Sequence, residues 1–225
     1  MEKAAFKEAA RAQTSFLAPL EKKKLLWLAA RMPASVNSDH LTGLGLLSTI
    51  GAGLGYWYAS RDPVIGLLFV CAMLVANWFG DSLDGTLARY RNRQRPRYGF
   101  YVDHIVDAFG TTFLMGGLAL SGFMSPSIAM PLLVVYLILS IESYLTTYTI
   151  GKFQISYWKF SPTELRILLC IGNLVLLWRP YAELLGRNFL IFDIGGVVGL
   201  IGMVAMLISA VARHTAQLYR EERLP

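Results

Sequence analysis

The sequence predicts an all-helical integral membrane protein with six transmembrane helices and an N-terminal amphipathic helix on the membrane surface. Three observations support this class. Hydrophobic residues make up 55% of the 225 residues, and the mean hydropathy is +0.46. Only 16% of the residues are charged, against roughly 25% in soluble domains. Several of the apolar segments exceed the roughly 20 residues that are needed to cross a bilayer.

The first element is a basic N-terminal segment, residues 1–36, which carries seven Lys and Arg interleaved with apolar residues. Its charged start argues against a signal peptide. Pro19 divides the segment, and Leu20 to Met32 could form an amphipathic helix on the membrane surface. Trp27 and the lysines before it are residues that a membrane interface selects. A solvated tail is the alternative.

The rest of the chain, residues 37–225, is predicted to be one transmembrane domain. We find no internal repeat in it. Its glycine-rich first and last segments contain Gly51-x3-Gly55 and Gly195-x3-Gly199, a spacing that allows close helix packing. The six apolar segments span approximately 41–60, 64–88, 98–122, 127–150, 163–184 and 189–212.

The positive charges predict the orientation of these segments. If the six segments cross the membrane in turn, 18 of the 21 Lys and Arg fall on one side. The positive-inside rule then places both termini and the 89–97 loop in the cytoplasm. The net charge of +6 follows from this distribution, so we expect membrane lipids and no nucleic acid as partners. We expect the cytoplasmic membrane of a prokaryote.

Two pairs of aspartates flank this cytoplasmic loop. Asp81 and Asp84 are three residues apart, and Asp103 and Asp107 are four apart, so each pair shares one face of a helix. Carboxylates at the end of an apolar segment are costly and need a reason. Four anionic oxygen donors that face one another need cations, and hard oxygen ligands suit Mg²⁺, Mn²⁺ or Ca²⁺. The alternative is that they face water or pair with nearby arginines.

Small residues accompany the aspartates and leave room for a ligand near the backbone. The combined string resembles the signature of the CDP-alcohol phosphotransferases, also called the CDP-alcohol phosphatidyltransferase superfamily. All eight fixed positions are filled, although nine residues separate Arg89 from Gly99 where eight are usual. The eight positions are Asp81, Asp84, Gly85, Ala88, Arg89, Gly99, Asp103 and Asp107.

The resemblance implies a membrane enzyme of phospholipid synthesis that has six transmembrane helices and forms a homodimer. It implies that an acceptor hydroxyl attacks the β-phosphorus of a CDP-linked alcohol, with release of CMP. Two ions of Mg²⁺ or Mn²⁺ would fit this chemistry. Asp81, Asp84 and Asp103 would hold the metal, and Asp107 would be a further ligand or the general base. The nucleotide would lie against Asp81, Gly85, Ala88, Arg89 and Gly99.

Two donor arrangements are implied by the superfamily. Either CDP-choline or CDP-ethanolamine reacts with diacylglycerol, or CDP-diacylglycerol reacts with a polar alcohol such as inositol, serine or glycerol phosphate. Asp103-His104 and Pro162-Thr163-Glu164 resemble segments of the choline/ethanolamine branch, in which the His and the Glu handle protons. His104 could instead turn away and bond a backbone carbonyl, and Glu164 could simply cap a helix.

Two further alternatives stay open at the level of sequence. Glu142 lies inside an apolar segment, where a carboxylate is either functional or hydrogen-bonded to a neighbouring Tyr or Thr. A divalent-cation transporter would also use acidic residues, but it needs a polar path to the other side. The acidic residues predicted to lie on that side are scattered: Asp62, Glu183 and Asp193.

Overall fold

Seven helices lie in the part of the chain that the structure, a computed structural model, describes: residues 10–12, 18–154, 161–184 and 186–222. Residues 1–9 and 13–17 of the predicted N-terminal segment lie outside it. The helices are α1 (Ala18–Arg31), α2 (Ser38–Ala59), α3 (Pro63–Tyr90), α4 (Pro96–Leu120), α5 (Pro126–Thr149), α6 (Pro162–Leu176) and α7 (Ile191–Glu221).

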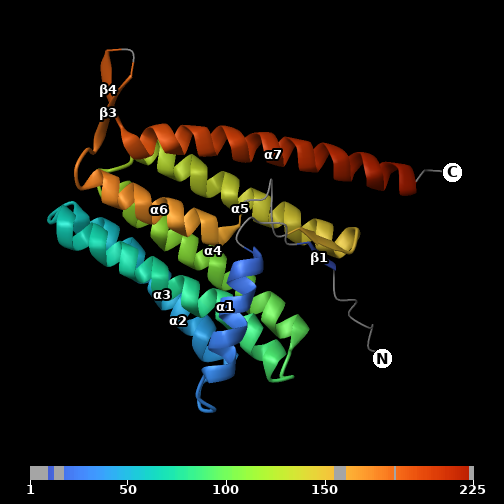
Figure 1. Cartoon of the computed structure of the whole chain (residues 1–225). Coiled ribbons are helices and arrows are strands. Elements are labelled where there is room, and N and C mark those ends of the chain that lie inside the picture. The colour runs from blue at the N-terminus through green and yellow to red at the C-terminus, as the bar shows by residue number, and fades with distance from the viewer. Residues whose placement is uncertain (1–9, 13–17, 155–160, 185, 223–225) are drawn as a thin grey trace.

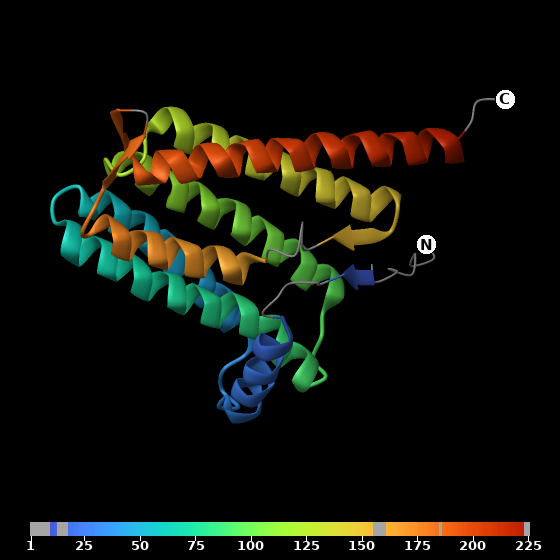
Figure 2. The ribbon, with the colours of Figure 1, turned by 45° about the horizontal axis from the view of Figure 1, so that its top comes forward.

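The strands are few and short. β1 (Ala10–Ala12) pairs in parallel with β2 (Lys152–Gln154), and β3 (Tyr181–Leu184) pairs antiparallel with β4 (Arg187–Leu190). The predicted all-helical class is therefore confirmed apart from these two small sheets. Figure 1 shows the long helices as one bundle, with α7 running alongside α5. The turned view in Figure 2 shows the same pairing.

Local sequence signals explain where the helices begin. Asn37 caps α2, with its side-chain oxygen 2.9 Å from the backbone nitrogen of His40. Asp62 caps α3 in the same way, 3.0 Å from the nitrogen of Ile65. Proline opens α3, α4, α5 and α6 within the first turn, where its missing N–H costs nothing.

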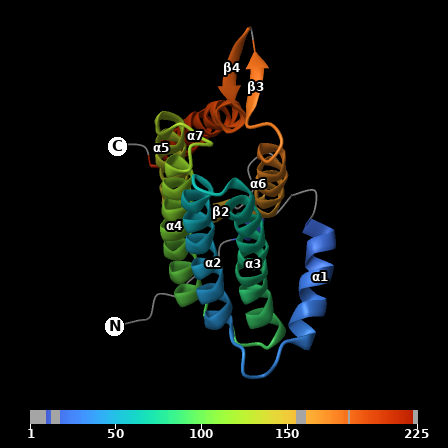
Figure 3. The same ribbon diagram turned by 90° about the vertical axis from the view of Figure 1, so that its left-hand side faces the viewer.

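The predicted apolar segment 163–184 is wrong beyond residue 176. α6 ends at Leu176, and the chain then forms the β3–β4 hairpin, whose turn contains Gly186 at φ +75°. Pro180 explains the end, because it cannot continue a helix and biases Arg179 away from helical dihedrals. The hairpin projects from one end of the bundle (Figure 3). The last segment is longer than predicted, because α7 continues to Glu221.

Length and hydropathy identify three of the described helices as able to span a membrane: α3, α5 and α7. Their most apolar windows have mean hydropathies of 2.0, 2.0 and 2.4. α6 has 15 residues, or about 22 Å of helix, which is short of the roughly 30 Å hydrocarbon core. The structure thus supports a membrane protein, and the count of six spans stays a prediction.

The main hydrophobic core includes residues of α2, α3 and α4 and extends to α5, α6 and α7. It contains Tyr56 of α2, Leu67 and Val70 of α3, and Leu118 of α4, all almost fully buried. The helices approach closely where glycines face each other. A Cβ at Gly117 would lie 1.9 Å from the carbonyl oxygen of Gly53. Such contact fixes the relative depth of α2 and α4.

The predicted N-terminal helix is present as α1 and packs beside α3 (Figure 3). Leu25 and Ala29 join a second core cluster with residues of α2 and α3. Glu21 is buried and accepts hydrogen bonds from Trp78 Nε1 at 2.8 Å and Thr163 Oγ1 at 2.7 Å. α1 is therefore attached both to α3 and to the start of α6.

Candidate active site

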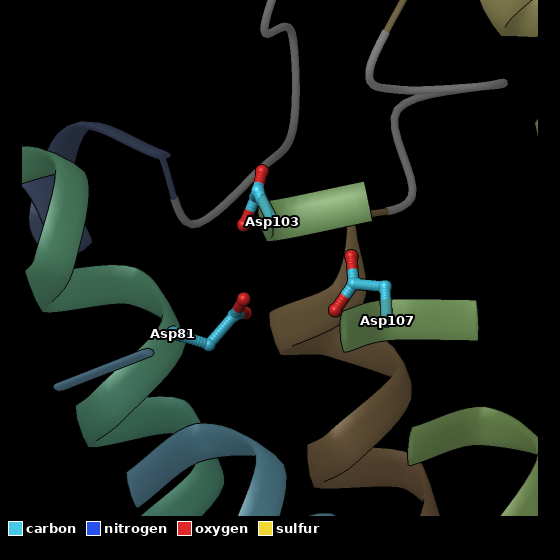
Figure 4. Close-up of side chains that lie close together, drawn as sticks. All are labelled: Asp81, Asp103 and Asp107. Atoms are coloured by element: carbon cyan, nitrogen blue, oxygen red, sulfur yellow. The ribbon is translucent and has the colours of Figure 1, made fainter. Parts of the chain in front are cut away.

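Three of the four predicted aspartates converge at one point between α3 and α4. One carboxylate oxygen each from Asp81, Asp103 and Asp107 lies within 4.8 Å of the other two. Figure 4 shows the side chains turned toward a common centre, Asp81 from α3 and the other two from α4. Asp103 and Asp107 share a face because they are one helical turn apart. All three are partly buried.

The fourth aspartate, Asp84, is held by α2. Its Oδ2 accepts a hydrogen bond from Thr42 Oγ1 at 2.6 Å, and its backbone carbonyl accepts one from Ser38 Oγ at 2.9 Å. Among the described residues, the converging carboxylate group does not include Asp84. Asp84 lies three residues after Asp81, so it remains beside the cluster on the same helix.

A cation from α6 already contacts this cluster. Arg166 Nη2 lies 2.5 Å from Asp81 Oδ2, and Arg166 Nε donates to Asn77 Oδ1 at 2.7 Å. Asn77 is buried and donates in turn to α2, to the carbonyl oxygen of Gly45 at 2.9 Å and to Thr49 Oγ1 at 2.7 Å. The guanidinium thus links α6 to both α2 and α3 at the level of the carboxylates.

The donor set fits a hard divalent cation. Carboxylate oxygens are the ligands that Mg²⁺ and Mn²⁺ prefer. If the three carboxylates are ionised, the single positive charge of Arg166 leaves two negative charges uncompensated among these four groups. Asp81, Asp103 and Asp107 would hold such an ion, and Asp84 is the nearest further carboxylate on α3.

The small residues of the motif lie where predicted, at the same end of α3 and α4. A Cβ at Gly99 would meet nothing within 4 Å. A Cβ at Gly85 would lie 3.3 Å from Nη1 of Arg89, whose Nη2 also donates to Thr86 Oγ1 at 3.3 Å. Ala88 is partly buried on the same helix. Nucleotide binding by these residues stays a prediction.

His104 bonds a backbone carbonyl, as one of the two alternatives predicted. Its Nδ1 lies 2.6 Å from the carbonyl oxygen of Phe100 and 3.8 Å from Asp103 Oδ2. A carbonyl can only accept, so Nδ1 carries the proton and Nε2 is the basic nitrogen of the neutral ring. The ring packs edge-on against Tyr144 of α5, with centroids 4.7 Å apart. A backbone bond and a proton-transfer role are therefore compatible.

Glu164 has the contacts of a helix cap. It forms a capping box with Ser161, whose backbone nitrogen lies 3.0 Å from Glu164 Oε2 and whose hydroxyl also donates to that oxygen. Its predicted partnership with His104 stays a prediction. Arg166, two residues further along α6, lies at the level of Asp81.

Glu142 belongs to a separate cluster between α5 and α7. Its Oε1 accepts from Thr146 Oγ1 at 3.0 Å and lies 2.5 Å from His214 Nδ1. The predicted hydrogen bond to a threonine is therefore present, together with an ion-pair partner that the sequence did not indicate.

The arginines of the 89–97 loop make contacts within the protein. Arg91 donates to the carbonyl oxygens of Met32 and Pro33, at 2.8 and 2.9 Å, and so caps the end of α1. Arg95 forms an ion pair with Asp39. These two arginines therefore have structural partners, whatever anions they also meet.

Arg166 and Thr42 contact the aspartates, and Asn77 contacts Arg166. The sequence did not assign these three residues to the site. A signal for Asn77 was present, because it lies one turn before Asp81 and is polar within an otherwise apolar run. Arg166 contributed only its positive charge to the count that predicts the orientation. No sequence pattern indicates that Thr42 belongs to the site, since a single threonine in a helix forms no recognisable spacing with other polar residues.

Comparison with protein families finds a match over most of the chain. The family model described as CDP-alcohol phosphatidyltransferase matches residues 38–211. No curated protein matches the chain. The match covers most of the chain and includes α2 through most of α7, with all four aspartates of the motif. This chain belongs to the CDP-alcohol phosphatidyltransferase family, whose members transfer substituted phosphate groups.

Proposed function

We propose that this protein transfers a substituted phosphate from CDP-choline or CDP-ethanolamine to the hydroxyl of diacylglycerol and releases CMP. The transfer reaction is supported chiefly by the convergence of Asp81, Asp103 and Asp107 in a member of this family. The choice of donor is supported by the Asp103-His104 pair, which resembles the choline/ethanolamine branch. The alternative is transfer from CDP-diacylglycerol to a polar alcohol. Family membership favours either transferase over a divalent-cation transporter.

The reaction is a displacement at the β-phosphorus of the donor. The acceptor oxygen forms a bond to that phosphorus, the bond from it to the bridging oxygen breaks, and CMP leaves. A bound divalent ion would neutralise the diphosphate and favour in-line attack. Asp81, Asp103 and Asp107 would fix its position, with Asp84 contributing to a second ion. Arg89, Gly85 and the open space at Gly99 would receive the nucleotide.

The general base separates the two donor arrangements. The contact of Asp107 with the carboxylate group supports a metal-ligand role for it. His104 is then the base, with Nε2 taking the proton of the acceptor hydroxyl while Nδ1 stays bonded to Phe100. Glu164 would assist His104. If CDP-diacylglycerol is the donor, we expect Asp107 to take the proton and His104 to be dispensable.

The membrane arrangement is also proposed. Six helices would span the membrane, with both termini and the aspartates at the cytoplasmic side, where soluble nucleotides are available. α1 would lie at the interface, where Lys22, Lys23 and Lys24 are exposed. We expect a homodimer in the membrane.

The test is CMP release by the full-length protein purified in detergent. CDP-choline and CDP-ethanolamine are each assayed with diacylglycerol, and CDP-diacylglycerol is assayed with inositol, serine and glycerol phosphate. Release that requires both a CDP-choline-type donor and diacylglycerol supports the first arrangement. Release only from CDP-diacylglycerol supports the alternative, and no release from any donor contradicts both.

A further inference from the structure

Arg166 of α6 forms an ion pair with one member of the carboxylate group, Asp81. Its Nη2 lies 2.5 Å from Asp81 Oδ2, and this is a full ion pair with both side chains largely shielded, 14% and 23% exposed. The second contact, from Nε to Asn77, holds the guanidinium in place because Asn77 is itself fixed to α2. The contact is therefore built from three helices and is not an incidental surface pair.

Two cations cannot share this oxygen without cost. A divalent ion bound to Asp81 Oδ2 would lie within a few ångströms of the guanidinium, and like charges at that separation repel strongly where water is scarce. When no ion is bound, the repulsion is instead between the negative charges of the carboxylates. Three of them within 4.8 Å repel one another, and the charge of Arg166 offsets part of that repulsion.

We propose that Arg166 is an internal counter-cation that competes with the divalent ion for Asp81. It stabilises the metal-free carboxylate group, and it must give up Asp81 Oδ2 when the ion binds. Its presence therefore lowers the affinity of the site for metal. This inference rests on the metal site of the proposed function, but it concerns a residue of α6 that is no part of the aspartate motif.

A positioning role for Arg166 predicts a change in metal affinity of the opposite sign. If Arg166 acted only to aim Asp81 at the metal, its removal would leave Asp81 free to rotate and the metal would bind more weakly. The sign of the affinity change on removing Arg166 therefore distinguishes a competitor from a positioning residue. Turnover alone does not, since both roles would alter it.

The experiment measures Mn²⁺ binding directly. Full-length protein in detergent is stripped of metal and titrated with Mn²⁺, with free Mn²⁺ followed by electron paramagnetic resonance. Arg166→Gln should bind Mn²⁺ about tenfold more tightly, since a hydrogen bond to a charged group contributes at least that much. Its metal-free form should unfold at a lower temperature than the wild type, and saturating Mn²⁺ should remove the difference.

Two further variants and a control complete the design. Arg166→Lys keeps the charge but loses the fork that reaches Asp81 and Asn77 together, so its affinity should lie between those of wild type and Arg166→Gln. Combining Arg166→Gln with Asp81→Asn should abolish the gain. Arg95→Gln removes an arginine from another Arg–Asp pair, with Asp39, and should leave Mn²⁺ affinity unchanged.

Each outcome either supports or overturns the proposed competition. Equal or weaker Mn²⁺ binding by Arg166→Gln, or by Arg166→Lys if the glutamine variant does not fold, overturns the competition and leaves the metal site standing. A similar gain in Arg95→Gln also overturns it, because the effect would then be general charge. Failure of the wild type to bind Mn²⁺ overturns the metal site of the proposed function as well.

Discussion

Nδ1 of His104 lies 2.6 Å from the carbonyl oxygen of Phe100, one turn earlier on α4. This bond assigns the tautomer, because the carbonyl can only accept a hydrogen bond. It also restricts the ring, which packs between Phe100 and Tyr144 at centroid distances of 4.1 and 4.7 Å. A general base benefits from such restriction, since proton transfer depends on a fixed distance to the acceptor hydroxyl.

Replacing His104 should therefore lower turnover without disturbing ligand binding. His104→Ala removes the proposed base, and we expect a loss of at least about 10²-fold in kcat. Binding of Mn²⁺ and of CDP, measured as thermal stabilisation of the protein, should remain. The control is His40→Ala, which removes an exposed imidazole at the start of α2. Near-wild-type turnover in His104→Ala would move the base to Asp107 and favour the CDP-diacylglycerol arrangement.

The carboxylate group predicts a requirement for divalent metal. Excess chelator should abolish CMP release, and Mg²⁺ or Mn²⁺ should restore it. Asp103→Asn keeps the shape of the side chain but removes one of the three charges, so we expect Mn²⁺ affinity to fall by about tenfold or more. Asp39→Asn, which removes the partner of Arg95 outside the group, serves as the matched control. Full activity in excess chelator would contradict the metal assignment.

Bulk at the motif glycines should block the nucleotide and spare the fold. A Cβ at Gly99 would meet nothing within 4 Å, and one at Gly85 would meet the flexible end of Arg89. Gly85→Leu and Gly99→Leu should therefore fold normally. Both should lose the thermal stabilisation by CDP plus Mn²⁺, which for wild type amounts to about 2.7 kcal/mol at a ligand concentration of 100 times Kd.

The control for the nucleotide prediction is Gly202→Leu on α7, where a Cβ also meets nothing within 4 Å. It should keep the full stabilisation by CDP. If Gly85→Leu and Gly99→Leu are stabilised as much as Gly202→Leu, the nucleotide binds elsewhere.

The sequence predicted those parts of the site that depend on one helix. The i,i+4 spacing of Asp103 and Asp107 places both on one face of α4 whatever surrounds it, and the structure brings them together with Asp81. The apolar runs likewise predicted α2, α3, α4 and α5 to within a few residues, but they missed the ends of α6 and α7. Such features are local, so periodicity is enough to reveal them.

The sequence could not predict the contacts that depend on which helix faces pack together. Arg166 and Asp81 are 85 residues apart, and their contact exists only because α6 packs against α3. The pairing of Asp84 with Thr42 likewise needs the depth at which α2 crosses α3. The apolar run that contains Arg166 does not reveal which neighbouring helix this side chain faces.

The last prediction concerns stability and follows from the close packing of α2 on α4. It compares two adjacent glycines of α4. A Cβ at Gly117 would lie 1.9 Å from the carbonyl oxygen of Gly53, and a Cβ at Gly116 would meet nothing within 4 Å. A backbone carbonyl inside a helix cannot move aside as a side chain can. Gly117→Ala must therefore push α2 and α4 apart, which should destabilise the protein by about 3 kcal/mol or more. Gly116→Ala should be neutral or stabilising by up to about 1 kcal/mol, because alanine loses less backbone entropy in a helix. Thermal unfolding of the two variants in the same detergent measures the difference. Equal unfolding temperatures would mean that α2 and α4 do not approach this closely at Gly53.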